Sequence, residues 1–533
     1  MKNLFKNRKC ILLICTLFIL GSCQEFLEDE LLSETSVNFL YSTPEGLETG
    51  VIGLYTLNRG LYEQTFWNGA IPLIVQSKSD LVFGRGGEIS LFSRLAWGAT
   101  LGDTGVNGGH GNYWTHYYKL VDRANGIIKG AENLTGIDKA QKNRIIAEAK
   151  CMRANSYFTL YRLFNNIFIS TEPTTPENAF DKPDNKSSEE EIFALLRSDL
   201  DFAIANLEWT TPEFGRFTQA SARHIRAKVA MWEGDWSEAA AQTDAIINNG
   251  SYSLEPNTAE VFKGGLSRNE TLFAIQYERD VIGGGGRNFM NWSSVANCAL
   301  APGVLKSLEN GGSGAAFMTL NKYVRNLLTE DPNDTRTKNT YYIFQYFFND
   351  PATLPAGKNI GDPLDLYDEN STDRNEFTRF YQRQNPGVLK FLDEEAEPTD
   401  RNHIKNIMVY RLAETYLIGA EAHMRSGNNA KALEYINIVR NRSNTASIST
   451  IDQEAILDER ARELAFEGQR WYTLKRMGVL LEYLQDHMGN DNYNQTYATG
   501  DPRLLIQEHM KNWVIPEAQI NLLGPNYPQN DGY

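Results

Sequence analysis

Apolar and small residues recur every three or four positions along a stretch near residue 150, which is the spacing of one buried helix face. The series is Ile145, Ala149, Met152, Ser156, Leu160 and Phe164, and Arg144, Glu148 and Lys150 decorate the other face. The same reading predicts helices at about 113–134, 188–207, 217–233 and 236–249, with Ser187 and Ser188 as caps before Glu189, Glu190 and Glu191. Residues 113–250 are therefore predicted to be almost wholly helical.

Two of the predicted helix pairs share one turn pattern. Ala227 and Ala230 lead to Gly234-Asp235-Trp236 and then Ala239, and Ala420 and Ala422 lead to Gly427-Asn428-Asn429 and then Ala432. Glycine permits a tight turn and small residues let two helices approach closely, so the pattern is typical of tetratricopeptide-like hairpins. Two unrelated helix ends capped by glycine are the alternative.

Residues 251–402 differ from the rest of the chain. They contain several glycine clusters and few long periodic runs, which is typical of irregular structure. Helical patterns return at about 403–425, 429–442 and 452–485. The predicted fold is mainly α, with a hairpin scaffold at about 41–250 and 403–533 and a loop-rich insertion at about 251–402. Because loops on a rigid scaffold commonly carry binding residues, specificity is expected in this insertion.

The amino end reads as a lipoprotein signal peptide. Basic residues precede an apolar run from Cys10 to Leu20, which is too short to span a bilayer as a helix. The run ends in Leu20-Gly21-Ser22-Cys23, and small residues before a cysteine suit cleavage and lipidation at that cysteine. We predict a signal peptide at 1–22, an acylated Cys23 and a lipidated tether at 23–40. A chance cysteine after an ordinary signal peptide is the alternative.

The net charge and the cysteine content limit the classes of function that this chain can have. Without residues 1–22 the chain keeps 48 basic and 67 acidic side chains, a net charge of −19, which disfavours nucleic acid as a partner. No later stretch approaches the roughly 20 apolar residues of a spanning helix, so lipid is the only predicted membrane attachment. Cys151 and Cys298 are interpreted as buried thiols, with a disulfide between them as the alternative.

Catalytic signatures are missing from the sequence. It has no HExxH, GxSxG, Walker or CxxC motif, and its seven histidines show no spacing that implies a metal site. Paired carboxylates could serve a glycosidase, but with 67 acidic residues such pairs arise by chance. The chain is therefore predicted not to be an enzyme and to use no cofactor or metal, with a structural calcium ion left open.

Aromatic residues in loop-like sequence are the candidate ligand contacts. A sugar ring has an apolar C–H face that can lie on an aromatic ring while its hydroxyls meet polar side chains. For each aromatic residue, a place in the core is the alternative. The candidates are Trp67, Phe83, Trp97, Phe289 and Trp292, with Arg85, Asn107, Asn288 and Asn291 as polar neighbours.

Several stretches together resemble the SusD/RagB family of nutrient-uptake lipoproteins. They include the lipobox with Phe26-Leu27-Glu28, Ala147-Glu148-Ala149-Lys150-Cys151-Met152-Arg153-Ala154, Arg411-Leu412-Ala413-Glu414-Thr415-Tyr416-Leu417, Asp458-Glu459-Arg460-Ala461-Arg462-Glu463-Leu464 and Arg470-Trp471-Tyr472. Most of these arginine, glutamate and aromatic positions lie on predicted helices, so we expect them to form buried ion pairs and packing contacts. Asn165-Asn166-Ile167 and Asp531 depart from the usual family pattern.

The resemblance implies a single SusD-like domain over residues 41–533, exposed at the outer membrane and anchored through Cys23. It implies that the protein captures a nutrient, expected to be a glycan or oligosaccharide, as the lid of a SusC-like TonB-dependent transporter. The alternatives are a lid for peptides or another nutrient, a surface glycoside hydrolase, and a scaffold for protein contacts. Because ligand contacts differ within the family, the resemblance assigns no site residue.

Overall fold

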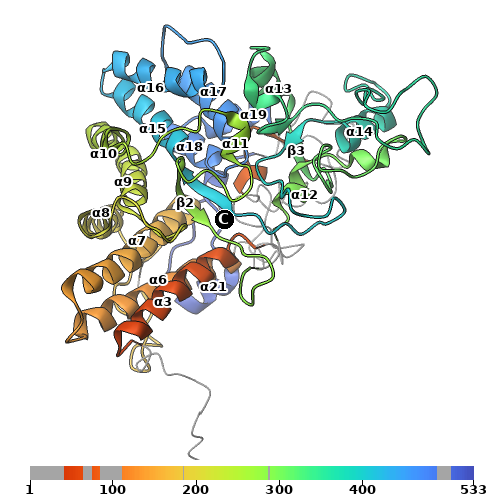
Figure 1. Cartoon of the computed structure of the whole chain (residues 1–533). Coiled ribbons are helices and arrows are strands. Elements are labelled where there is room, and N and C mark those ends of the chain that lie inside the picture. Colours follow the sequence, from red (N-terminus) through yellow and green to blue (C-terminus); the bar gives the residue numbers. More distant parts are fainter. Residues whose placement is uncertain (1–40, 64–74, 85–110, 184, 286–287, 489–505) are drawn as a thin grey trace, which may run out of the picture.

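The computed structural model describes residues 41–63, 75–84, 111–183, 185–285, 288–488 and 506–533. A stack of helices forms one side of the molecule, and a region of short elements lies beside it (Figure 1). The stack consists of α3 (Pro44–Gly60), α6 (Gly111–Asn133), α7 (Lys139–Phe164), α8 (Glu189–Asn206), α9 (Gln219–Glu233), α10 (Trp236–Asn249), α15 (Leu412–Arg425), α16 (Asn429–Arg442) and α17 (Gln453–Leu464). Further along the chain lie α18 (Arg470–Met477), α19 (Leu480–His487), η5 (Glu508–Lys511) and α21 (Glu517–Leu523). The prediction of a mainly α fold is confirmed.

Helix α7 is the centre of the first half of the stack. It packs between α6 and α8, and every residue of the predicted apolar stripe is buried. The assignment of Glu148 to an exposed face was wrong, since that side chain is 2% exposed. Glu148 accepts a hydrogen bond of 2.6 Å from the Tyr55 hydroxyl of α3 and pairs with Arg144 and Arg216. Packing by elements distant in sequence, which periodicity does not reveal, covers that face.

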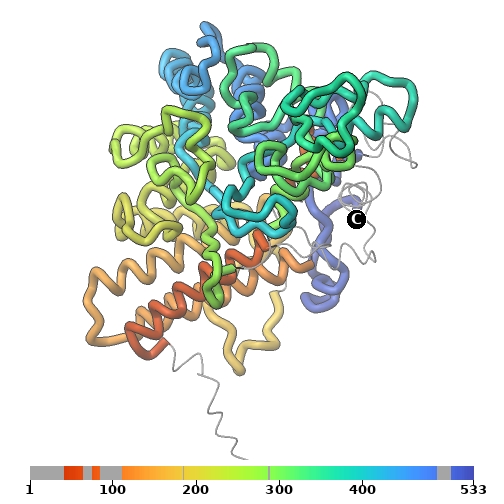
Figure 2. The backbone as a smooth tube through the Cα atoms, turned by 45° about the vertical axis from the view of Figure 1, so that its right-hand side comes forward, coloured from red at the N-terminus to blue at the C-terminus, as the bar shows by residue number. Residues whose placement is uncertain are grey.

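The two predicted hairpins, α9–α10 and α15–α16, stack on each other through α10 and α15 (Figure 2). Gly234 and Gly427 have φ angles of 74° and 81°, the left-handed conformation that glycine adopts without strain. Both small residues that follow the turns, Ala239 and Ala432, are fully buried. The tetratricopeptide-like pattern is therefore confirmed.

Most predicted helix ends agree with the structure, with three corrections. Ser188 caps α8 in a capping box with Glu191, whereas the Ser187 hydroxyl accepts from the Ile169 amide and caps no helix. The helix expected at 403–425 begins only at Leu412. The one expected at 452–485 is divided into α17, α18 and α19, with Gly468 and Gly478 at left-handed φ angles between them.

The region between α10 and α15 consists of short elements. These are α11 (Thr258–Val261), β2 (Thr271–Ile275), α12 (Met290–Ser294), η2 (Cys298–Leu300), β3 (Met318–Leu320), α13 (Lys322–Thr329), η3 (Thr335–Thr337), β4 (Tyr342–Ile343), α14 (Arg374–Arg383) and β5 (Gly387–Val388). Three antiparallel strand pairs connect this region: β1 (Val82–Gly84) with β3, β2 with β6 (Ile407–Arg411), and β4 with β5. A second apolar core around Tyr346 and Phe348 stabilises it.

Buried ion pairs connect the helices, as the resemblance implied. Arg153 of α7 holds Asp199 of α8, and Arg470 of α18 holds Asp80. Glu463 of α17 accepts from Arg336, Arg411 and Arg442. Each of these charges has an opposite charge beside it, which is what permits its removal from water.

Cys151 and Cys298 are both free and buried, so the interpretation as thiols is confirmed. In the ranges that the structure describes, no helix is both long and apolar enough to cross a bilayer.

Candidate ligand site

A small aromatic cluster lies at α12, in the region of short elements. The Phe289 and Trp292 ring centroids are 5.5 Å apart, and Phe317 meets Trp292 edge to face at 4.8 Å. Phe289 and Trp292 each keep 9% of their surface exposed, and Phe317 is half-buried. The guanidinium carbon of Arg401 lies 5.6 Å from the Trp292 ring centroid, within the range of a cation–π contact.

Local hydrogen bonds position these rings. The Asn288 side chain accepts from the Met290 amide at 3.0 Å, at the start of α12. The Asn288 carbonyl accepts from the His403 amide at 3.0 Å, and this bridge places the chain that carries Arg401 beside Trp292. On the other side, the Trp292 carbonyl accepts from the Ala315 amide at 2.7 Å, which holds the strand leading to Phe317 against α12.

The groups beneath the cluster are uncharged or paired. Burial lowers the pKa of His403, although Asp393 opposes this shift, and the His403 Nδ1 accepts from the Asp393 amide at 3.1 Å. Lys405 is buried, which lowers its pKa, and its ammonium binds the Leu392 carbonyl at 2.5 Å and the Glu394 carboxylate at 3.2 Å. Arg401, by contrast, is exposed and has its guanidinium over the Trp292 ring.

The structure brings together two of the predicted aromatic residues, Phe289 and Trp292. Asn288 and Asn291 are fully buried and make hydrogen bonds within the fold, the latter to the Gly311 carbonyl at 3.0 Å. Phe83 is 1% exposed and stacks on Tyr381 at 3.8 Å. The side chains of Phe83, Asn288 and Asn291 are therefore enclosed by the protein, where they stabilise the fold of this region.

The other predicted residues, Cys23, Trp67, Arg85, Trp97 and Asn107, lie outside the described residues. Gly84, the last residue of β1, pairs with Met318, which directly follows Phe317.

Two residues of the cluster, Phe317 and Arg401, were not predicted. Phe317 follows a run of small residues and Arg401 lies in an acidic loop, so neither has a local signal of its role. Both reach Trp292 through contacts between segments far apart in sequence.

Aromatic rings with an arginine beside them have the chemistry that a partly apolar, hydroxylated ligand such as a sugar ring requires. Across the described ranges, no group of three or more His, Cys, Asp or Glu side chains could hold a metal ion.

Comparison with known proteins decides the family. The sequence model of the SusD family matches residues 269–533. A SusD-like protein of Formosa agariphila is 26% identical over 99% of this chain and 100% of its own length. The chain belongs to the SusD/RagB family. Over 131 residues, 24% of the chain, it is also 34% identical to the starch-binding protein SusD of Bacteroides thetaiotaomicron, of which the match covers 22%.

Solved structures of SusD proteins share the fold. A laminarin-binding SusD-like protein superposes with a TM-score of 0.68 at 23% identity, covering 91% of this chain and 99% of the other. A SusD homologue from Bacteroides thetaiotaomicron has a TM-score of 0.72 at 20% identity, covering 94% and 99%. The helical stack and the region of short elements are therefore those of the SusD fold.

Proposed function

We propose that this chain is a cell-surface lipoprotein that binds a glycan and serves as the lid of a SusC-like TonB-dependent transporter. The aromatic cluster at α12 is the observation that supports a glycan most directly. It combines two rings that are each 9% exposed with the half-buried Phe317 and an arginine, residue types on which a sugar can stack and form hydrogen bonds. Related proteins are named for binding starch, laminarin or glycans, which supports the same ligand class.

Cys23 is the proposed attachment point. Its acyl chains would hold the protein at the outer membrane, since each buried methylene adds about 0.8 kcal/mol of membrane affinity. Residues 24–40 would then act as the tether between the lipid and α3. With this attachment, the protein can remain bound beside a barrel while it moves to admit ligand.

Affinity electrophoresis tests the glycan proposal. Native gels that contain laminarin, starch or other polysaccharides should retard the wild-type protein with at least one polymer, and Trp292→Ala should reduce that retardation. Trp236→Ala is the control, because Trp236 is a half-buried tryptophan that also has an arginine, Arg425, over its ring, but it belongs to the α9–α10 hairpin. Equal loss in both variants would show that Trp292 has no specific role.

A peptide lid is the main alternative, and a surface glycoside hydrolase is a further one. The same gels distinguish them when they are combined with an assay for reducing ends. Retardation without release of reducing ends supports binding, whereas release supports hydrolysis. If no polysaccharide retards the protein but peptides bind it, the ligand class proposed here is wrong and the lid role still stands.

Copurification tests the lid role itself. A tagged protein extracted in mild detergent from its native membrane should bring with it a large β-barrel protein at a fixed ratio. Recovery of the lipoprotein alone, under conditions that preserve other outer-membrane complexes, would contradict a stable lid.

A further inference from the structure

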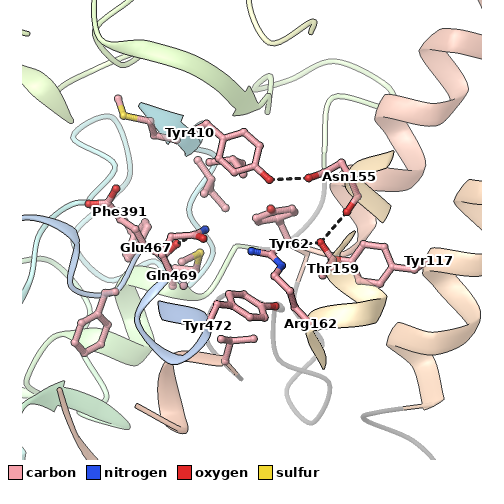
Figure 3. A pocket seen from close by; sticks show the side chains of 17 residues that line it. Tyr62, Tyr117, Asn155, Thr159, Arg162, Phe391, Tyr410, Glu467, Gln469 and Tyr472 are labelled. Atoms are coloured by element: carbon pink, nitrogen blue, oxygen red, sulfur yellow. Dashed lines mark hydrogen bonds between the residues drawn. The ribbon is translucent and has the colours of Figure 1, made fainter. Parts of the chain in front are cut away.

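A small cavity lies where the helical stack meets the region of short elements (Figure 3). Its walls come from α7, β6, the turn before α18 and the start of α12. The residues that matter here are Tyr62, Asn155, Arg162, Met290, Glu467 and Tyr472. The cavity volume is about 50 Å³. Roughly 10–15 Å³ of such space is enough for one water molecule, so the cavity has room for a small inorganic ion.

Among the described residues, Arg162 is a buried cation without a carboxylate partner. It is 3% exposed, and its guanidinium carbon lies 4.0 Å from the Tyr472 ring centroid and 4.2 Å from that of Phe158. Nε donates to the Phe158 carbonyl and Nη2 to the Thr159 hydroxyl, both at 3.2 Å. Within the described part of the chain, Nη1 has no hydrogen-bond partner and the guanidinium makes no ion pair. Leaving such a charge unpaired inside a protein is costly.

The other polar groups around Arg162 are mostly donors. The Asn155 Oδ1 accepts from the Tyr410 hydroxyl at 2.6 Å, so the NH₂ group of the same amide remains as a donor. Tyr62 and Tyr472 contribute hydroxyls. Glu467 is the carboxylate in this lining, and Arg411 and Lys390 already hold it at 2.7–2.8 Å. Besides the unneutralised charge of Arg162, the cavity therefore offers the Asn155 amide and tyrosine hydroxyls that can donate to an anion.

We propose that this cavity binds one small monovalent inorganic anion, such as chloride, between Arg162 and Asn155. The anion accepts from the guanidinium and the amide, and it neutralises the charge that the fold leaves unpaired.

The bound anion connects two parts of the molecule. Arg162 and Asn155 belong to α7, whereas Met290, on the other wall, is the first residue of the helix that carries Trp292. Because an anion that binds only the folded state stabilises it, halide should strengthen this junction. The site is distinct from the aromatic cluster and does not depend on what that cluster binds.

Crystals grown or soaked in bromide test the site directly. An anomalous peak beside Arg162 Nη1 is expected. In solution, replacing gluconate by chloride at constant ionic strength should raise the unfolding temperature of the full chain by several degrees. No peak, together with identical unfolding temperatures in the two salts, would mean that the cavity holds only water and would overturn the proposal.

Asn155→Asp provides a variant that tests the mechanism even if removal of Arg162 prevents folding. The new carboxylate keeps the acceptor for Tyr410 and supplies Arg162 with an internal anion, so the chloride-dependent shift should disappear. Asn143→Asp is the matched control, because it makes the same change on α7 at a side chain that bonds Asn206 instead. A full chloride shift in Asn155→Asp would contradict the proposed site, whereas loss in that variant alone supports it.

Discussion

At the scale of single residues, the fold depends on charged side chains that are buried beside side chains of opposite charge. Burial by itself would raise the pKa of the Glu463 carboxyl, but Arg442, Arg411 and Arg336 together hold that pKa well below its usual range. Arg411 also binds Glu270 and Glu467, so Glu463 belongs to a network that joins α17 to β6 and β2. Removal of one member leaves the others as uncompensated charges.

Glu463→Gln should therefore lower the free energy of unfolding by about 3–5 kcal/mol, the cost typical of breaking a buried pair. Urea denaturation measures this loss. The control is Glu508→Gln, whose carboxylate is 69% exposed and pairs with Lys511; an exposed pair contributes at most about 1 kcal/mol. Equal effects of the two substitutions would show that the Glu463 network is not stabilising.

Acid should weaken this network and the separate ion pairs of Glu414. Glu414 and Glu459 are also buried with depressed pKa values, because Lys228 and His224 outweigh burial at the first and Arg336 and other arginines do so at the second. A carboxyl whose pKa is lower in the folded state contributes stability above the unfolded value, about 4.3 for glutamate, and loses it as the pH falls further. The urea midpoint should thus drop between pH 5 and pH 3, and a constant midpoint would contradict this account.

At the scale of elements, the hairpin stack depends on close helix approach. A Cβ atom added at Gly419 of α15 would lie 2.9 Å from the Tyr435 ring of α16 and 3.0 Å from the Thr243 hydroxyl of α10. Thr243 and Tyr435 are themselves buried, so they have little room to move. Gly419 thus sets the spacing of three helices.

Gly419→Val should destabilise the protein by about 1–3 kcal/mol, the usual effect of overpacking. Gly53→Val is the matched control, because Gly53 is also inside a helix but has no atom within 4 Å of an added Cβ. Thermal unfolding of the two variants measures the difference, and a Gly419 variant as stable as the control would show that α15 can shift freely.

The elements also show which parts of the fold a sequence reveals. The turns at Gly234 and Gly427 and the cap at Ser188 depend on residues that are adjacent in sequence. They could therefore be predicted from the local sequence pattern. Strand β6 could not, because Ile407–Arg411 becomes extended by pairing with β2, more than a hundred residues earlier. The candidate site could likewise be predicted only in part. Trp292 was predicted as an aromatic residue in a loop, but its partners Phe317 and Arg401 come from distant segments. Distant segments also bury Phe83, Asn288 and Asn291.

At the scale of the whole molecule, one residue is proposed to determine where the protein resides. Cys23→Ala should abolish labelling by a radioactive or clickable fatty acid and shift the protein from the membrane fraction to the soluble fraction. Cys298→Ala is the control. The Cys298 thiol is buried in the second core, so this substitution should leave labelling unchanged. Continued labelling of the Cys23 variant would disprove the predicted anchor.

Calorimetric titration with oligosaccharides of increasing length tests the central claim, that this family member binds a glycan at the α12 aromatic cluster. The oligosaccharides are cut from the polymer that retards the protein best. Affinity should rise with length until the site is filled, and Trp292→Ala should weaken it about tenfold or more, which corresponds to about 1.4 kcal/mol. Trp236→Ala should bind like the wild type. Absence of heat with every glycan, or unchanged affinity in Trp292→Ala, would contradict the claim.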